Sequence, residues 1–154
     1  MDDLTLARAI HVVSVAFWIG GVYMVTMVVL PMVHQQNTPE DKIRVFEGVE
    51  KRFSLQARAL VLLAGLSGFY MVHKLDAWDR YMSVEFWWMH AMTVIWALFT
   101  LALFVLEPFV LHKWFHKRVN ENADTAFRLV SRVHIIALTL SIITIIGAIY
   151  GAHG

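Results

Sequence analysis

The sequence predicts an all-α, integral-membrane protein, an up-down four-helix bundle that forms a single domain over residues 1–154. Two observations lead to this prediction. The chain is 58% hydrophobic, whereas a soluble domain is about 45–50% apolar. The apolar residues also gather in four runs, and each run reaches the roughly 20 residues that a helix needs to cross hydrocarbon. Little chain is left over for a soluble domain.

The first predicted span covers Leu4–Val33, and it follows an acidic start at Asp2 and Asp3. Because this run is too long for the core of a signal peptide and lacks basic residues before it, we expect no cleavable signal. Pro31 should kink or end this span, since proline cannot donate a helical hydrogen bond.

The second span is predicted over Phe53–His73, although its helix should begin earlier. Thr38 suits an N-cap and Pro39 suits the first turn. The helix is therefore expected to start outside the membrane and to continue into it. The small residues of Ala64–Gly68 should let a neighbouring helix approach closely, and they would also make room for a flat macrocycle.

The third span is predicted over Val84–Phe109 and the fourth over Ala126–Tyr150. Pro108 should bend the third span near its end. Gly147 and Gly151, four residues apart, should again allow close packing. The aromatic residues near the start of the third span are typical of a membrane boundary; they are Trp78, Tyr81, Trp87 and Trp88.

The basic residues predict the orientation of the bundle. Ten of the 13 Lys and Arg residues lie in or beside the connections between spans 1 and 2 and between spans 3 and 4. We therefore expect both termini outside and a multi-pass protein of the bacterial inner membrane. The ten basic residues are Lys42, Arg44, Lys51, Arg52, Arg58, Lys113, Lys117, Arg118, Arg128 and Arg132.

The absence of cysteine and the small net charge limit the possible functions. The chain has no cysteine, which excludes disulfides, iron–sulfur clusters, thiolate metal sites and covalent attachment of c-type haem. The formal net charge of +1 offers no basis for binding nucleic acid, so we expect membrane lipid rather than nucleic acid as the surrounding partner.

Histidines at membrane depth are the candidate functional residues. An ionisable side chain is costly inside a bilayer, and neutral imidazole is a common ligand of metals and of haem iron. His11 lies about 10 Å inside span 1 by helical rise. His90 lies at a similar depth in span 3, so these two imidazoles are expected to ligate haem b. Arg8, one turn from His11, suits a haem propionate, and Trp18 lies on the same helical face.

His134 in span 4 is too far along the helix to share an iron with His11 if that span is straight. It is expected to ligate a second, inner haem with His112 or His34, or else to have a structural or proton-handling role. The sequence thus allows one haem or two. Glu107 and Arg58 should lie at similar depths, so an ion pair between them is also expected.

Three short motifs resemble those of the four-helix membrane protoporphyrinogen oxidases. His11, Trp18 and Gly21 have the spacing of a His-Trp-Gly pattern in the first span of that family. Trp88-Met89-His90-Ala91 resembles the Trp-x-His-x-Lys motif of their third span, and Phe127-Arg128 resembles the Phe-Arg that opens their fourth. The membrane domain of copper-resistance D proteins is similar at the first helix.

This resemblance implies haem b binding through His11 and also through His90. Two departures bear on activity. Met92 stands where the oxidases have a lysine, and Ser131-Arg132-Val133-His134 replaces their Asn-Glu-x-Pro. The closest resemblance is to uncharacterised four-span bacterial proteins with a Glu-Pro late in span 3, here Glu107-Pro108.

The leading functional hypothesis is a b-type haem protein that moves electrons between a quinol and a periplasmic redox partner. One alternative is an enzyme similar to protoporphyrinogen oxidase, so the sequence leaves open whether the protein is an enzyme. Another is a copper or small-solute transporter that uses histidine and methionine as ligands. A homodimer is compatible with the sequence.

Overall fold

The computed structural model describes residues 2–153, and it describes their side chains except at 110–112 and 152–153. Every regular element in this range is a helix, and no strand occurs in it. Four helical stretches are long and apolar enough to cross a membrane: Asp3–His34, Pro39–Lys74, Val84–Phe109 and Lys113–Gly151. These stretches include all four predicted spans and differ from them mainly in extending further into the connections.

The first stretch consists of helix α1 (Asp3–Met24), a π-helical turn η1 (Val25–Val29) and helix α2 (Leu30–His34). Asp2 caps α1 by accepting a hydrogen bond from the backbone N–H of Leu4 at 2.9 Å. The stretch does not end at Pro31. This residue lies in the first turn of α2, where the missing N–H of proline is tolerated.

Helix α3 (Pro39–Lys74) begins as predicted, with the side chain of Thr38 accepting a hydrogen bond from the N–H of Asp41 at 3.1 Å. Its 36 residues extend about 54 Å at 1.5 Å per residue, which exceeds the roughly 30 Å of a hydrocarbon core. Helix α3 runs antiparallel to α1, because Asp3 at the start of α1 pairs with Lys74 at the end of α3, at 3.3 Å.

Two short 3-10 turns, η2 (Trp78–Met82) and η3 (Val84–Phe86), lead into helix α4 (Trp87–Leu101). A π-helical segment, η4 (Ala102–Leu111), contains Pro108 and leads into α5 (His112–His153). Helix α5 is interrupted at Asn122, whose backbone is extended. Its side chain then caps the next helix by accepting from the N–H of Thr125 at 2.9 Å. The connection before the fourth span is therefore mostly helical.

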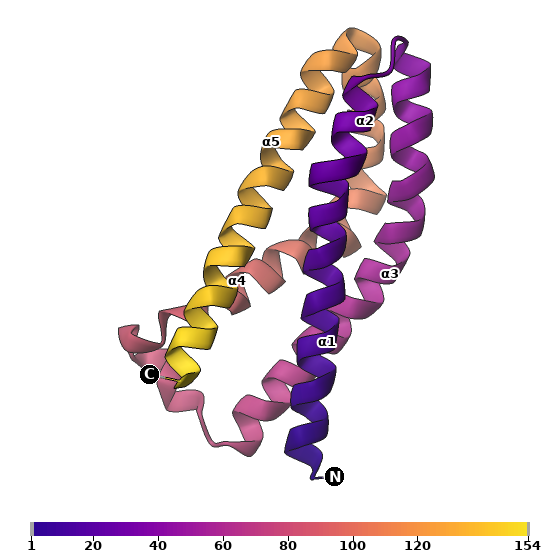
Figure 1. Ribbon diagram of the computed structural model, residues 1–154. Coiled ribbons are helices and arrows are strands. Elements are labelled where there is room, and N and C mark those ends of the chain that lie inside the picture. The colour runs from indigo at the N-terminus through magenta and orange to yellow at the C-terminus, as the bar shows by residue number, and fades with distance from the viewer. Residues whose placement is uncertain (1, 154) are drawn as a thin grey trace.

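The two described ends of the chain lie at the same end of the molecule (Figure 1). We call this the terminal end. The opposite end, the loop end, holds the α2–α3 connection and the break at Asn122. An ion pair between Lys42 and Asp124 joins these two segments. Helices α4 and α5 contact each other at the terminal end, and α4 crosses obliquely towards α3 (Figure 1).

The interior has two apolar clusters. One surrounds Phe127 near the loop end, where its ring contacts Phe115 and Phe46 at centroid distances of 5.3 and 5.6 Å. The other lies midway along the helices and includes Trp18, Val61 and Leu138. The first, second and fourth stretches supply the buried residues of these clusters, whereas the third supplies only partly buried ones such as Phe99.

The outward faces are apolar as well. Phe17, Leu55 and Leu66 are each at least 66% exposed, and a soluble monomer rarely exposes contiguous apolar surface of this extent. Within the helices, hydroxyl groups donate to carbonyl oxygens four residues earlier, which satisfies them without water; examples are Thr26, Ser67, Thr93, Thr100, Ser141 and Thr144. Length, composition and exposure together indicate a multi-pass membrane protein.

Candidate functional site

His11 projects from α1 towards α3. Its Nδ1 lies 2.8 Å from the carbonyl oxygen of Ala64 and 3.4 Å from the hydroxyl oxygen of Ser67. The carbonyl can only accept, so Nδ1 carries the proton and donates it. The lone pair of a neutral imidazole is then on Nε2. Among the described residues nothing bonds to that atom.

This arrangement matches the usual environment of a histidine that ligates a metal. Such residues commonly donate their second ring N–H to a backbone carbonyl, which sets the tautomer and the ring orientation. Gly68 helps to make the space, because a Cβ atom there would lie 3.1 Å from Cε1 of His11. The sequence predicted Ala64–Gly68 as a stretch for close packing, but it did not reveal that Ala64 and Ser67 orient the imidazole.

His90, the predicted opposite ligand, lies in different surroundings. Its Nδ1 is 3.1 Å from the carbonyl oxygen of Phe86 and its Nε2 is 3.0 Å from that of Tyr81. Both nitrogens thus face acceptors, and a neutral imidazole can donate to only one of them. His90 and His11 share no bonding partner in the described structure. Ligation by His90 would require its contact with Tyr81 to open.

His134 is oriented in the same manner as His11. Its Nδ1 lies 2.9 Å from the carbonyl oxygen of Val130, four residues earlier, and no described group bonds to Nε2. Of the two histidines predicted as its partner, His34 is bonded instead to the hydroxyl of Ser131 at 3.0 Å. The side chain of His112 is outside the described residues.

Arg8 and Trp18 flank His11 along α1. Arg8 is exposed and forms no ion pair among the described residues, so its guanidinium is available to an anion. Trp18 is 4% exposed, and its ring packs edge-on against Phe99 with centroids 4.9 Å apart. Its indole N–H is buried without an acceptor. A buried donor of this kind normally has a partner, so the interior lacks one acceptor beside this face.

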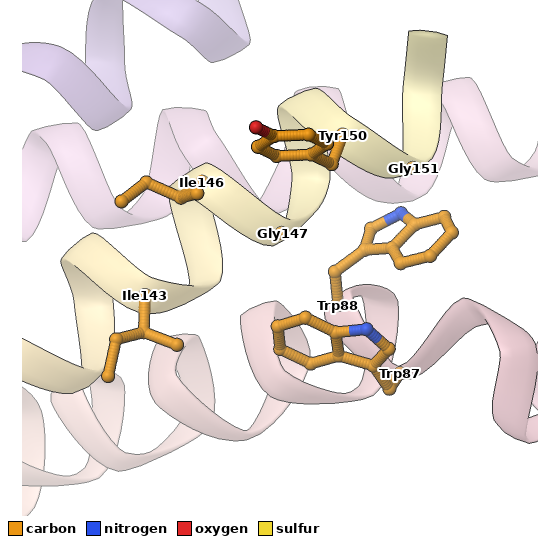
Figure 2. Close-up of a pocket in the computed structure, with 7 residues that line it drawn as sticks. All are labelled: Trp87, Trp88, Ile143, Ile146, Gly147, Tyr150 and Gly151. Atoms are coloured by element: carbon orange, nitrogen blue, oxygen red, sulfur yellow. The ribbon is translucent and has the colours of Figure 1, made fainter. Parts of the chain in front are cut away.

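An apolar groove of about 490 Å³ opens between α4 and α5 at the terminal end. Figure 2 shows the indole rings of Trp87 and Trp88 facing the glycines of α5. None of the candidate ligand histidines lines it. The lining residues are Trp87, Trp88, Ile143, Ile146, Gly147, Tyr150 and Gly151.

The predicted ion pair between Arg58 and Glu107 is confirmed, with Nη2 of Arg58 3.1 Å from Oε1 of Glu107. The sequence did not predict that the Ser54 hydroxyl also donates to this oxygen, at 2.6 Å. Nor did it predict that Nε of Arg58 donates to the carbonyl of Leu103 at 3.1 Å. The spacing of Ser54 and Arg58 on one face of α3 was the available signal.

The bond to Leu103 has a local cause in η4. In a π-helix the N–H of residue i+5 bonds the carbonyl of residue i. Five residues after Leu103 stands Pro108, which has no N–H. The carbonyl of Leu103 therefore lacks its partner in the π register, and the arginine side chain supplies one.

Within the described residues, no group of three or more His, Asp or Glu side chains is arranged to hold a metal ion. Comparison of the chain with protein-family models, with curated proteins and with solved structures gave no match.

Proposed function

We propose that the protein is a b-type haem protein of the bacterial inner membrane, with both termini outside, and that it transfers electrons. The observation that supports this best is the state of His11: its Nδ1 donates to Ala64 and its Nε2 is left with a lone pair. A neutral imidazole that donates through Nδ1 and has a free lone pair on Nε2 is a suitable axial ligand for haem iron.

Other residues fit a haem bound beside α1. The guanidinium of Arg8, one turn before His11, would pair with a propionate. The buried indole N–H of Trp18, which lacks an acceptor, would donate to a bound group. When bound, haem would supply one-electron chemistry. The residues of this chain would hold it, orient it and exclude water from it.

His90 and His134 are the candidates for further haem ligands. His90 would bind only after its contact with Tyr81 opens, whereas His134 already has an unbonded Nε2. We therefore keep His90 as the candidate opposite ligand at the depth of His11, and His134 as the candidate ligand of an inner haem. A quinol and a periplasmic acceptor are the redox partners proposed for such a protein.

The test is the visible spectrum and the haem content of protein purified from haem-replete cells. Wild type should carry haem b, and His11→Ala should lose it or change its spin state. His73→Ala is the matched control, since His73 is exposed on α3 and its side chain forms no hydrogen bond, ion pair or ring contact with the described residues. It should leave haem content unchanged.

A colourless wild-type preparation would overturn the proposal. Haem content unaffected by His11→Ala would remove His11 as the ligand. If haem is present, complementation of a strain lacking its porphyrinogen oxidase would separate electron transfer from the oxidase alternative. Copper retained in place of haem would favour the copper-handling alternative.

A further inference from the structure

A row of polar residues follows one face of α3 near the loop end. The spacings of three and four residues place them on the same side of a helix, and that side faces η4 and the beginning of α5. None of them belongs to the proposed haem site. The members of this polar row are Glu47, Glu50, Ser54 and Arg58.

Glu107 of η4 completes the row from the opposite side. One of its carboxylate oxygens, Oε1, accepts hydrogen bonds from Ser54 at 2.6 Å and from Arg58 at 3.1 Å. Its side chain is 25% exposed. Glu50, also partly buried, lies one helical turn before Ser54 on the same face of α3, which brings its carboxyl group near Glu107. Two carboxyl groups are therefore held together beside one guanidinium.

A hydrogen bond between these two carboxyl groups needs a proton. An ionised carboxylate can only accept hydrogen bonds, so two carboxyl groups share one only if one of them is protonated. The charges favour the same state. With both carboxyls ionised, Arg58, Glu107 and Glu50 sum to a charge of −1, and with one proton they are neutral. A net charge is costly where the groups are partly removed from water.

The same row continues towards water at the loop end. Glu47 lies one turn nearer the loop end than Glu50 and forms ion pairs with His116 at 2.9 Å and with Lys51 at 3.2 Å. His116 and Lys51 are both more than a third exposed. A histidine and a carboxylate in contact with each other and with water can pass a proton between them.

We propose that Glu50 and Glu107 hold one exchangeable proton between them, and that this proton enters from the loop end through His116 and Glu47. In each transfer one proton leaves water, passes through the His116–Glu47 pair and neutralises the Glu50–Glu107 pair. No electron moves in this step. The inference does not depend on haem, because it rests on a different group of residues.

Infrared spectroscopy of the purified full-length protein tests the proposal. Wild type should show the carbonyl band of a protonated carboxyl group at neutral pH. The band should disappear as pH rises, and it should shift after transfer to D2O. Glu50→Gln and Glu107→Gln should each lose it. Glu121→Gln is the control, because Glu121 is exposed on α5 and pairs only loosely with Arg118, at 3.7 Å.

The route has a separate readout. Glu47→Gln and His116→Gln should keep the band but slow its shift in D2O. An unchanged rate in both variants would overturn the entry route. Absence of the band in wild type, or its persistence in both Glu50→Gln and Glu107→Gln, would overturn the shared proton. The thermal unfolding transition of each variant is compared with that of Glu121→Gln. A similar transition shows that the variant is folded, so the loss of its infrared band is not caused by unfolding.

Discussion

At the scale of single residues, backbone carbonyls decide how the polar side chains of this protein are oriented. Ala64 and Val130 each accept from a histidine Nδ1, and Tyr81 occupies the Nε2 of His90. In a largely apolar interior few other acceptors are available, so buried side-chain donors bond to backbone carbonyls. Leu103 shows the same effect with Arg58.

The link between Arg58 and Pro108 can be measured with a double-mutant cycle. Arg58→Lys keeps a charge for Glu107 but removes the forked donor that reaches Leu103. This change should destabilise wild type more than it destabilises Pro108→Ala, because alanine restores an N–H that can bond to Leu103. We expect a coupling energy of about 0.5–3 kcal/mol.

The measurement is thermal or denaturant unfolding in detergent micelles, made on both single variants and on the double variant. Equal costs of Arg58→Lys in the two backgrounds would show that Leu103 and Pro108 do not explain the arginine bond. The position of Glu107 would then be its main cause.

At the scale of elements, indole rings packed on glycines hold the helices together. A Cβ atom on Gly147 would lie 2.4 Å from the ring of Trp87, and one on Gly151 would lie 2.3 Å from the ring of Trp88. The ring of Trp96 lies on Gly65 of α3 in the same way, and its N–H donates to the carbonyl of Val61 at 2.9 Å. Helix α4 therefore meets both neighbours through tryptophan.

Gly147→Ala should separate α4 from α5 at the terminal end. Overpacking of this kind typically costs about 1–3 kcal/mol. Gly20→Ala is the matched control, because a Cβ there meets nothing within 4 Å and alanine has the higher helix propensity. Unfolding in micelles should show a loss of stability for Gly147→Ala and none for Gly20→Ala. Equal behaviour of the two variants would contradict the described packing of Trp87.

At the scale of the whole molecule, both described termini lie at one end (Figure 1). Ten of the 13 Lys and Arg residues lie in or beside the two connections at the loop end. Helix α3, with 36 residues, is longer than a hydrocarbon core is thick, and its first turns lie at the loop end. The aromatic cluster around Phe127 packs against this segment and supports it.

We expect a reporter fused after Gly154 to be active only in the outer compartment, since basic residues near span ends are retained on the cytoplasmic side. A reporter placed in the α2–α3 connection, at Asn37, should give the opposite result. Cytoplasmic activity of the first fusion would reverse the orientation proposed for the protein, and with it the direction from which protons reach Glu50.

Much of this architecture could be predicted from the sequence. The four spans, the Thr38 cap and the pairing of Arg58 with Glu107 all depend on local patterns: apolar run length, cap chemistry and the cost of an isolated charge in lipid. Run length and cap chemistry act within one helix. The cost of an isolated charge in lipid leaves few possible partners for Arg58. Each is visible in the order of residues.

Only the tertiary structure decided which polar atoms meet. From depth along the helices, the sequence predicted that His11 and His90 lie together. In the structure, the rotation of each helix about its axis and the turns before α4 direct His11 to Ala64 and His90 to Tyr81 instead. Helical rise determines depth, whereas azimuth depends on packing against other helices. The sequence by itself therefore determined the spans and the residues at each depth. Packing decided that His11 keeps an open nitrogen and that Glu50 lies beside Glu107.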